Sequence, residues 1–278
     1  MRDTSMREAL VSHLERAGTL RLPRVAAAMR AVPRHRFLPG LPLDEAYADR
    51  AIAIKTSNDE IVSSISQPGM IAQMLELLAP AVGDRVLEIG TGSGYNAALL
   101  SEIVGPSGHV TTVELDAELA ARARETLAEN GYGKVVVVAA DGSRDVIETP
   151  AFDRVIVTAR TQDVAGAWWD ELAEGARIVV PLRLDGVGEY AVGFVRQGNR
   201  LQSVGAHPCA FIALRGDAAA TGEGDVFYRD PSASSGITSM RRIAEVVAVR
   251  SADATPALLD EADVVVARPV TLFGITFA

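Results

Sequence analysis

The sequence has almost no cysteine, because Cys209 is the single one among 278 residues. That excludes an internal disulfide framework and a zinc site built from cysteines, and leaves Cys209 the role of a small core residue. Nowhere do about 18 uncharged apolar residues follow one another, which argues against a membrane-spanning helix. The N-terminus has acids among its apolar positions, where a signal peptide has an unbroken apolar core. We therefore expect a cytoplasmic protein.

Positive charge is also scarce. The 27 Lys and Arg residues against 36 Asp and Glu give a formal net charge of -9 and a pI near 5.0. An acidic protein repels phosphate backbones, so nucleic acid is not expected as the principal substrate. The basic cluster Arg34-His35-Arg36 is expected to be a solvated surface feature. The four histidines form no catalytic set, and no metal site is predicted.

The middle of the chain alternates between short apolar runs and helical stretches such as Tyr95–Val104 and Ala117–Asn130. Strands as apolar as Val135–Ala140 must be covered on both faces. The pattern predicts an α/β, Rossmann-like fold with a mostly parallel sheet and helices on both faces. The predicted strands are Arg85–Ile89, His109–Glu114, Val135–Ala140, Arg154–Thr158, Ile178–Pro181, Glu189–Arg196 and Leu201–Val204.

Helices also precede the sheet. Residues 6–32 predict two short helices separated at Leu22-Pro23, because proline is tolerated only at a helix start. Another begins after Ser66-Gln67-Pro68, and Trp168-Trp169 are expected to pack in the core, with a peptide-binding shelf as the alternative. We expect residues 1–216 to form one domain with an N-terminal helical cap. After Arg215 the composition becomes small and polar, typical of a linker, so residues 217–278 are expected to be a small C-terminal extension.

The run Glu88-Ile89-Gly90-Thr91-Gly92-Ser93-Gly94 lies where an apolar strand turns into a helix. Glycines there let the backbone approach a ligand closely, and the helix N-terminus offers free N–H groups. Dinucleotide binders use G-x-G-x-x-G, whereas the spacing here is G-x-G-x-G with Glu88 two residues ahead. A pyrophosphate is disfavoured beside a carboxylate. S-adenosylmethionine has no phosphate and carries an ammonium and a sulfonium, which a carboxylate attracts.

Acids also follow the next two strands. Glu114 can accept hydrogen bonds from ribose hydroxyls, and Asp141-Gly142 can receive the adenine amino group. The carboxyl ends of neighbouring parallel strands meet at one edge of the sheet, where open α/β sheets bind ligands. The sequence therefore predicts an S-adenosylmethionine site. Nicotinamide or nucleotide binding is the alternative, although the chain has no G-x-x-x-x-G-K-[ST] loop.

In order and spacing, the segments VPRHRFLP, AYADR, SSISQPGMIAQMLE, GDRVLEIGTGSGYNAALL, DG and FDRVIVTA resemble the protein-L-isoaspartate O-methyltransferases, from roughly Leu22 to Arg215. The resemblance implies a seven-stranded class I methyltransferase sheet. It places the serine that contacts the substrate carboxylate at Ser66, with Ser64 at a threonine position. The cofactor-binding residues expected on these grounds are Glu88, Gly90, Thr91, Gly92, Gly94, Glu114, Leu115, Asp141, Gly142 and Thr158.

Methylation of a carboxylate needs no general base, because a free pKa of about 4 leaves the group ionised and nucleophilic at pH 7. The enzyme has to strip water from it and hold one oxygen in line with the sulfonium methyl. Ser66, Ser64 and Gln67 are the predicted catalytic residues, with Gln67 and Thr158 expected to line the same cleft. Alternatively, Ser66 is the N-cap of the helix after Pro68.

The sequence departs from the repair enzymes of this family before Ser66 and after Thr158. Arg160 is a candidate partner for a substrate carboxylate, or an exposed arginine. PLRLDG and HPCAFIALRG resemble extended relatives of ribosomal peptide biosynthesis, in lanthipeptide or ATP-grasp systems. Those relatives methylate an aspartate of a modified precursor peptide, and the ester collapses to a succinimide (aspartimide).

We therefore expect an S-adenosylmethionine-dependent carboxyl O-methyltransferase whose partner is a peptide or protein with an aspartyl or isoaspartyl carboxylate. The first expectation for its substrate is an aspartate of a ribosomally made modified peptide. General isoaspartyl repair is one alternative. Small-molecule methylation, or a cofactor-binding module without catalysis, is the other. Neither nucleic acid nor a membrane is expected as a partner.

Overall fold

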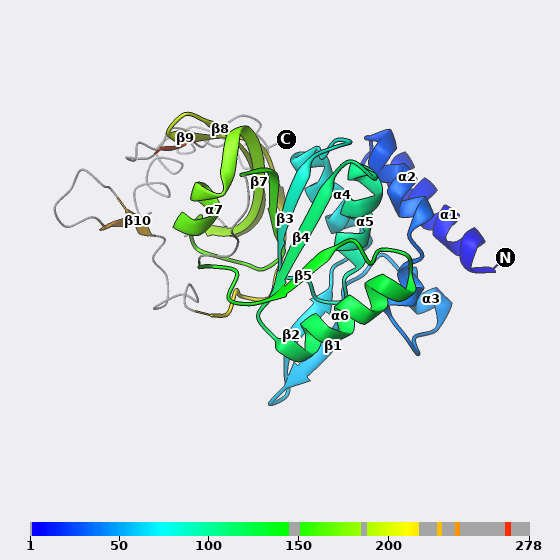
Figure 1. The fold of residues 1–278 in the computed structure, drawn as a ribbon. Coiled ribbons are helices and arrows are strands. Elements are labelled where there is room, and N and C mark those ends of the chain that lie inside the picture. Colours follow the sequence, from blue (N-terminus) through cyan, green and yellow to red (C-terminus); the bar gives the residue numbers. More distant parts are fainter. Residues whose placement is uncertain are drawn as a thin grey trace, which may run out of the picture.

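The computed structural model describes residues 2–144, 151–184 and 188–216, and the three short strands at 227–229, 237–239 and 265–267. Its centre is one large sheet with helices on both faces (Figure 1). Seven of its strands run in the order β9-β8-β7-β6-β3-β4-β5. They are β3 (Arg85–Ile89), β4 (His109–Glu114), β5 (Val136–Ala139), β6 (Phe152–Val157), β7 (Leu172–Leu184), β8 (Gly188–Gln197) and β9 (Arg200–Pro208).

The pairing confirms the mostly parallel α/β sheet. Strands β5, β4, β3, β6 and β7 pair parallel to one another, whereas β8 and β9 return as an antiparallel hairpin. The predicted strands are found with small shifts of their ends, except for two that are much longer than predicted. Strand β7 extends well beyond the predicted Ile178–Pro181, and β9 well beyond the predicted Leu201–Val204. Strand β12 (Val265–Ala267) pairs antiparallel with β9, so the C-terminal extension contributes an eighth strand to the sheet.

Alternate residues along each strand enter different cores, as the period of two in a strand requires. Val86 of β3 and Ile156 of β6 belong to the core under α4 (Pro68–Leu78), α5 (Tyr95–Val104) and α6 (Ala117–Glu129). Leu87 and Val155 belong to the core on the opposite face, with Trp168 of α7 (Gly166–Asp170). Both faces are therefore covered, as the apolar strands predicted.

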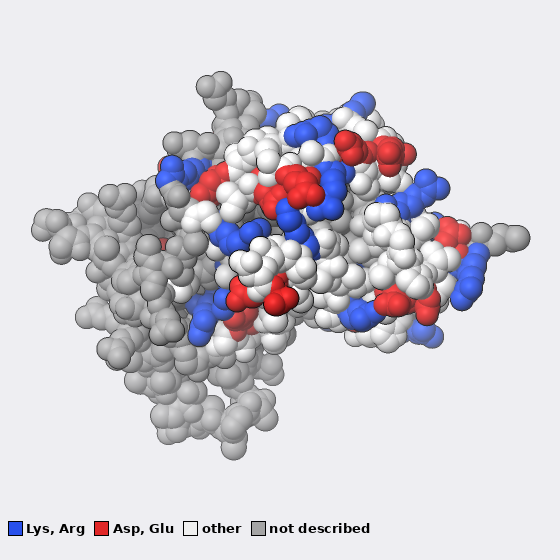
Figure 2. Space-filling model, turned by 90° about the horizontal axis from the view of Figure 1, so that it is seen from below, with Lys and Arg blue, Asp and Glu red and all other residues white. Residues whose placement is uncertain are grey.

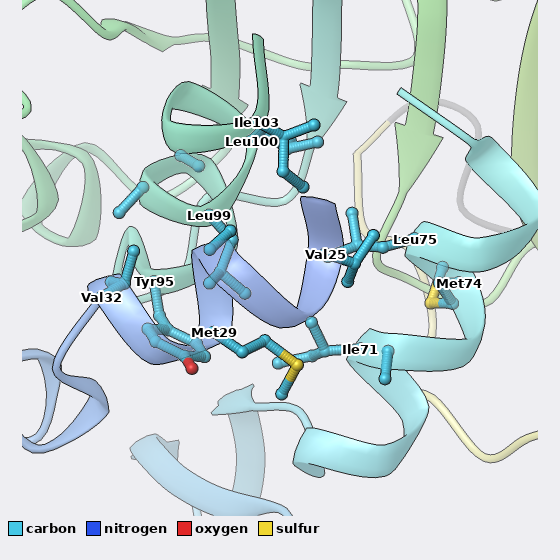
Figure 3. Close-up of a cluster of buried hydrophobic side chains, with 14 of the residues drawn as sticks. Val25, Met29, Val32, Ile71, Met74, Leu75, Tyr95, Leu99, Leu100 and Ile103 are labelled. Carbon is cyan, nitrogen blue, oxygen red and sulfur yellow. The ribbon is translucent and has the colours of Figure 1, made fainter. Parts of the chain in front are cut away.

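Two N-terminal helices, α1 (Arg2–Arg16) and α2 (Pro23–Ala31), confirm the predicted break at Pro23, which starts the second helix. Figure 3 shows α2 wedged between α4 and α5, with Val25 and Met29 directed at side chains of both neighbours. The apolar face of α2 is buried because Val25, Ala26, Ala28 and Met29 recur at helical spacing.

A hairpin of β1 (Ile52–Ser57) and β2 (Glu60–Ile65) was not predicted. Its two turn residues, Asn58 and Asp59, both have positive φ, at 50° and 64°, which is the backbone of a type I′ turn. The hairpin projects beside α6 (Figure 1). Lys55 Nζ lies 2.6 Å from Asp116 Oδ2 at the start of α6, so an ion pair joins the hairpin to α6.

The basic cluster is not wholly a surface feature. In the short segment formed by η1 (Arg34–Phe37) and α3 (Leu43–Ala46), Arg34 is fully buried. Its Nε donates to the carbonyl oxygen of Ala46 at 2.9 Å, and its guanidinium lies 5.3 Å from the centre of the Tyr95 ring. The expectation of a solvated Arg34 was wrong, because a carbonyl and a ring face replace much of its water.

The remaining predictions concern the extension and the surface. Apart from Gly216, the predicted linker after Arg215 lies outside the described residues. Strand β10 (Phe227–Arg229) pairs antiparallel with β11 (Ile237–Ser239). No helix within the described ranges is long and apolar enough to cross a membrane. On the described part of the face in Figure 2, basic and acidic side chains are interspersed. That part of this face offers no continuous basic surface for a phosphate backbone.

Candidate active site

The loop between β3 and α5 has a backbone conformation that requires glycine at several positions. Gly90, Gly92 and Gly94 all have positive φ, at 101°, 53° and 85°, a conformation that favours glycine. A Cβ on Gly90 would lie 2.4 Å from Thr158 Oγ1, and one on Gly94 would lie 3.1 Å from Leu127 of α6. The loop therefore needs glycine at Gly90 for space beside β6, and at Gly94 for packing on α6.

A cavity of about 780 Å³ opens at this loop, bounded by strand ends and by the β1–β2 hairpin. It brings together nine of the predicted site residues: Ser64, Ser66, Gln67, Gly90, Gly92, Glu114, Leu115, Gly142 and Thr158. An inner pocket of about 40 Å³ shares five of these and adds two further predicted residues, Glu88 and Thr91. The serine corner and the glycine loop thus face one space, although they come from separate parts of the chain.

Glu88 is fully buried below the loop. Its carboxylate accepts hydrogen bonds from Thr112 Oγ1 at 2.6 Å and from Asn96 Nδ2 at 2.8 Å. Thr91 Oγ1 lies 2.7 Å from Thr112 Oγ1, which extends the network towards the loop. Burial raises the pKa of Glu88 to about 7, although both donors act to lower it. The site thus holds a buried carboxylate for which a cationic ligand would be a strong partner.

Glu114 already holds the loop in shape. Its Oε2 accepts from the Gly92 amide at 2.9 Å, and its Oε1 accepts from the Asp116 amide at 3.1 Å. It is 7% exposed and lines the cavity, as does Leu115, which is 41% exposed. The ribose contact of Glu114 stays a prediction.

Asp141 and Gly94 are the two predicted cofactor residues that line neither the cavity nor the inner pocket. Asp141 accepts from the Ser143 amide and hydroxyl at 3.0 and 2.6 Å. Gly142 does line the cavity, and its carbonyl oxygen accepts from Trp168 Nε1. Trp168 is completely buried on α7, the helix after β6, so the predicted core packing of Trp168 is confirmed.

The serine-glutamine-proline corner, Ser66-Gln67-Pro68, differs from the sequence prediction in the residue that caps α4. The N-cap position of α4 belongs to Gln67, and no side-chain cap bond is made there, so Ser66 as N-cap was wrong. Instead Asp49 Oδ1 accepts from the Gly69 amide at 2.7 Å, and its Oδ2 accepts from Gln67 Nε2 at 3.1 Å. Because Asp49 caps the helix from outside, the half-buried Ser66 is left facing both pockets.

The segment Pro208–Arg215 forms a wall of the cavity, which was not predicted from the sequence. It runs beside Arg160, whose amide donates to the Ile212 carbonyl at 2.9 Å. The side chain of Arg160 pairs with Glu189 at 2.8 Å, so it has a structural partner. Cys209 lines the cavity, and burial raises the pKa of its thiol to about 12, so it is protonated at neutral pH.

The acceptor atoms of the site suit a cationic ligand without phosphate. Glu88 has no cationic partner among the described residues, and the buried Asn96 Oδ1 accepts no hydrogen bond from them. Within the same residues, no three His, Cys, Asp or Glu side chains gather closely enough to hold a metal ion. These features fit S-adenosylmethionine.

Comparison with known proteins decides the family. The model of the protein-L-isoaspartate(D-aspartate) O-methyltransferase (PCMT) family matches residues 5–219. The chain belongs to this family. This methyltransferase is 38% identical over 212 residues to the protein-L-isoaspartate O-methyltransferase of Methanopyrus kandleri, covering 76% of this chain and 92% of the relative. It is 37% identical over 219 residues to that of Hyperthermus butylicus, covering 76% and 89%.

Solved structures agree with the fold. A protein-L-isoaspartate O-methyltransferase superposes on this methyltransferase with a TM-score of 0.70 at 31% identity, covering 77% of this chain and 67% of the other. A Plasmodium falciparum protein described as a beta-aspartate methyltransferase (PCMT), solved with S-adenosyl-L-homocysteine, has a TM-score of 0.64 at 18% identity, covering 75% and 98%. The protein therefore has the class I fold, uses S-adenosylmethionine and is a carboxyl methyltransferase.

Proposed function

We propose that this methyltransferase transfers a methyl group to isoaspartyl carboxylates in peptides and proteins. The observation that carries the proposal is the inner pocket, in which Ser66, Glu88 and Gly90 line one space. The relatives from Methanopyrus kandleri and Hyperthermus butylicus are named protein-L-isoaspartate O-methyltransferases. General isoaspartyl methylation, first considered as an alternative, therefore replaces tailoring of a ribosomal peptide as the leading proposal.

Each group at the site has a separate role in the proposed methyl transfer. The cofactor, when bound, supplies an electrophilic methyl group on a sulfonium. Ser66 donates a hydrogen bond to the substrate carboxylate and orients one oxygen, while Ser64 and the Asp49-held Gln67 shape the corner around it. Met70, Phe211 and Ile212 form an apolar wall that keeps water away from the reacting oxygen. Held in this way, that oxygen would be in position to accept the methyl group that the bound cofactor supplies.

The cofactor is proposed to lie along the glycine loop. Glu88 and Thr91 would face its amino-acid end from the inner pocket, and Glu114 and Leu115 its ribose. Gly90, Gly92 and Thr158 would lie against its middle, and Gly142 at the adenine. Asp141, which lines neither pocket, would contact the adenine only from the edge of the cavity. Gly94 would not contact the cofactor and would instead support binding by keeping the glycine loop in its conformation.

Replacing Ser66 by alanine tests the carboxylate role. A hydrogen bond to a charged group contributes about 1.5–3 kcal/mol, so kcat/KM on an isoaspartyl peptide should fall by about 10- to 100-fold. The dissociation constant of S-adenosylhomocysteine, measured by calorimetry, should stay within about twofold. Ser101→Ala, on α5 and outside both pockets, is the control. Unchanged turnover of the Ser66 variant on every isoaspartyl peptide would contradict the assignment.

A second candidate function is methylation of an aspartate in a modified ribosomal peptide. It is favoured by the extension, since 59 residues follow the end of the family match (278 minus 219), and β12 adds a strand of that extension to the sheet beside the first residues of β9. On this proposal residues 1–216 carry the methyl transfer and residues 217–278 bind the peptide.

Mass spectrometry separates the two functions. The enzyme and cofactor are incubated with a linear isoaspartyl peptide and, separately, with a macrocyclic peptide containing a normal aspartate. Methyl ester on the linear isoaspartyl peptide supports the leading proposal. Ester on the macrocyclic aspartate alone, followed by loss of methanol, supports the second and contradicts the first.

A further inference from the structure

Asn96 stands at a place in the cofactor site that the sequence did not single out. It is the second residue of α5, directly after the glycine loop, and it lines the inner pocket. Its Nδ2 donates to Glu88 Oε1 at 2.8 Å. Its Oδ1 is buried and has no hydrogen-bond partner among the described residues. A buried acceptor without a donor is rare in native proteins, and it calls for a missing partner.

The network around Glu88 shows what kind of partner would fit. Thr112 and Asn96 both donate to the Glu88 carboxylate, and Thr91 pairs with Thr112. The carboxylate thus collects neutral donors without a cation from the described residues. Beside it lies the Asn96 carbonyl oxygen, a second acceptor. The arrangement suits a compact positive group with several N–H donors, and an ammonium has three.

S-adenosylmethionine carries one group that meets both requirements. Its sulfonium is positive but donates no hydrogen bond, and its adenine amino group donates but is neutral. We propose that Asn96 recognises the ammonium of the cofactor's amino-acid end, with Nδ2 holding Glu88 in place and Oδ1 accepting a hydrogen bond from the ammonium. Thr112 differs from Asn96 because it acts only through Glu88.

Two ligands test the assignment. S-adenosylhomocysteine has the amino-acid end, and 5′-methylthioadenosine has the adenosine and sulfur without it. Calorimetry on the full-length Asn96→Ala variant should give an S-adenosylhomocysteine dissociation constant raised by about tenfold or more, and a methylthioadenosine constant within about twofold of wild type. Equal weakening of both ligands would overturn the proposal. Methylthioadenosine binding also reports folding, and Asn96→Leu, which preserves volume, serves if the alanine variant does not fold.

Thr112→Val is the matched comparison, because it removes the other donor to Glu88 and leaves Asn96 intact. Both variants lose a hydrogen bond that lowers the pKa of Glu88, so both should weaken S-adenosylhomocysteine binding near pH 7. At pH 8.5, where Glu88 is more fully ionised, Thr112→Val should return to within about threefold of wild type at the same pH. Asn96→Ala should stay weak.

If Asn96→Ala recovers at pH 8.5 as fully as Thr112→Val, Asn96 acts only through Glu88 and the direct contact with the ammonium is wrong. These measurements need no peptide, so the result does not depend on the proposed isoaspartyl substrate. A protein that fails to methylate any isoaspartyl peptide could still show the selective loss of S-adenosylhomocysteine binding.

Discussion

Glu88→Gln should make the empty protein more stable at pH 8 and weaken its binding of S-adenosylhomocysteine by about 100-fold. The pKa of Glu88 is raised from 4.5 to about 7 by burial. The folded state therefore keeps a proton that the unfolded state has lost, and the stability this gives is present at low pH and lost as pH rises through about 7. About 2.5 pKa units correspond to roughly 3 kcal/mol.

Glutamine carries no charge, so this pH dependence should vanish. Urea unfolding should give the variant an advantage of up to roughly 3 kcal/mol at pH 8 and much less at pH 5. Calorimetry should show the loss of affinity, because the cofactor's positive charge loses its buried counter-charge. Glu125→Gln, on the exposed face of α6, controls for net charge. A variant whose stability follows the wild-type pH curve would contradict the buried, proton-holding carboxyl.

Trp168→Ala should cost about 3–5 kcal/mol of unfolding free energy, the usual range for a large aromatic residue removed from a core. Trp168 has no exposed surface, and it packs between the sheet and the segment that carries Gly142. Chemical denaturation measures the loss. A change below about 1 kcal/mol would mean that α7 does not complete this core.

Trp168→Phe separates packing from hydrogen bonding. Phenylalanine keeps most of the buried ring but cannot donate to the Gly142 carbonyl oxygen. We expect a stability loss of about 1 kcal/mol and an S-adenosylhomocysteine affinity reduced by about threefold or more, because Gly142 lines the cavity. Trp169→Phe, on the same helix, should leave the affinity unchanged. If Trp168→Phe and Trp169→Phe reduce the affinity equally, the hydrogen bond to Gly142 does not explain the loss.

The sheet could be predicted because its strands are apolar on both faces and end at glycines or acids. Glu88 and Glu114 illustrate this, since each marks the end of a buried strand and each lies at the cavity region. The hairpin at Ile52–Ile65 was not predicted because apolar and polar residues alternate only weakly along its strands. The Asn58-Asp59 pair between two β-branched runs was the available signal, since both residues tolerate positive φ.

The missed parts of the site depend on contacts between distant segments. Asn96 looked like an ordinary helix residue until the structure placed it 2.8 Å from Glu88. The segment Pro208–Arg215 lies at the cavity because the Arg160 backbone holds Ile212 and Leu214 through hydrogen bonds. Arg34 is buried by a ring and a carbonyl from other elements. No local pattern of residue types carries such information.

Gly216 gives the junction with the C-terminal segment a fixed geometry. Its φ is 102°, and a Cβ there would lie 2.4 Å from Asp141 Oδ2. The chain thus leaves this domain pressed against the turn that follows β5, so any side chain at position 216 would displace either Asp141 or the chain itself.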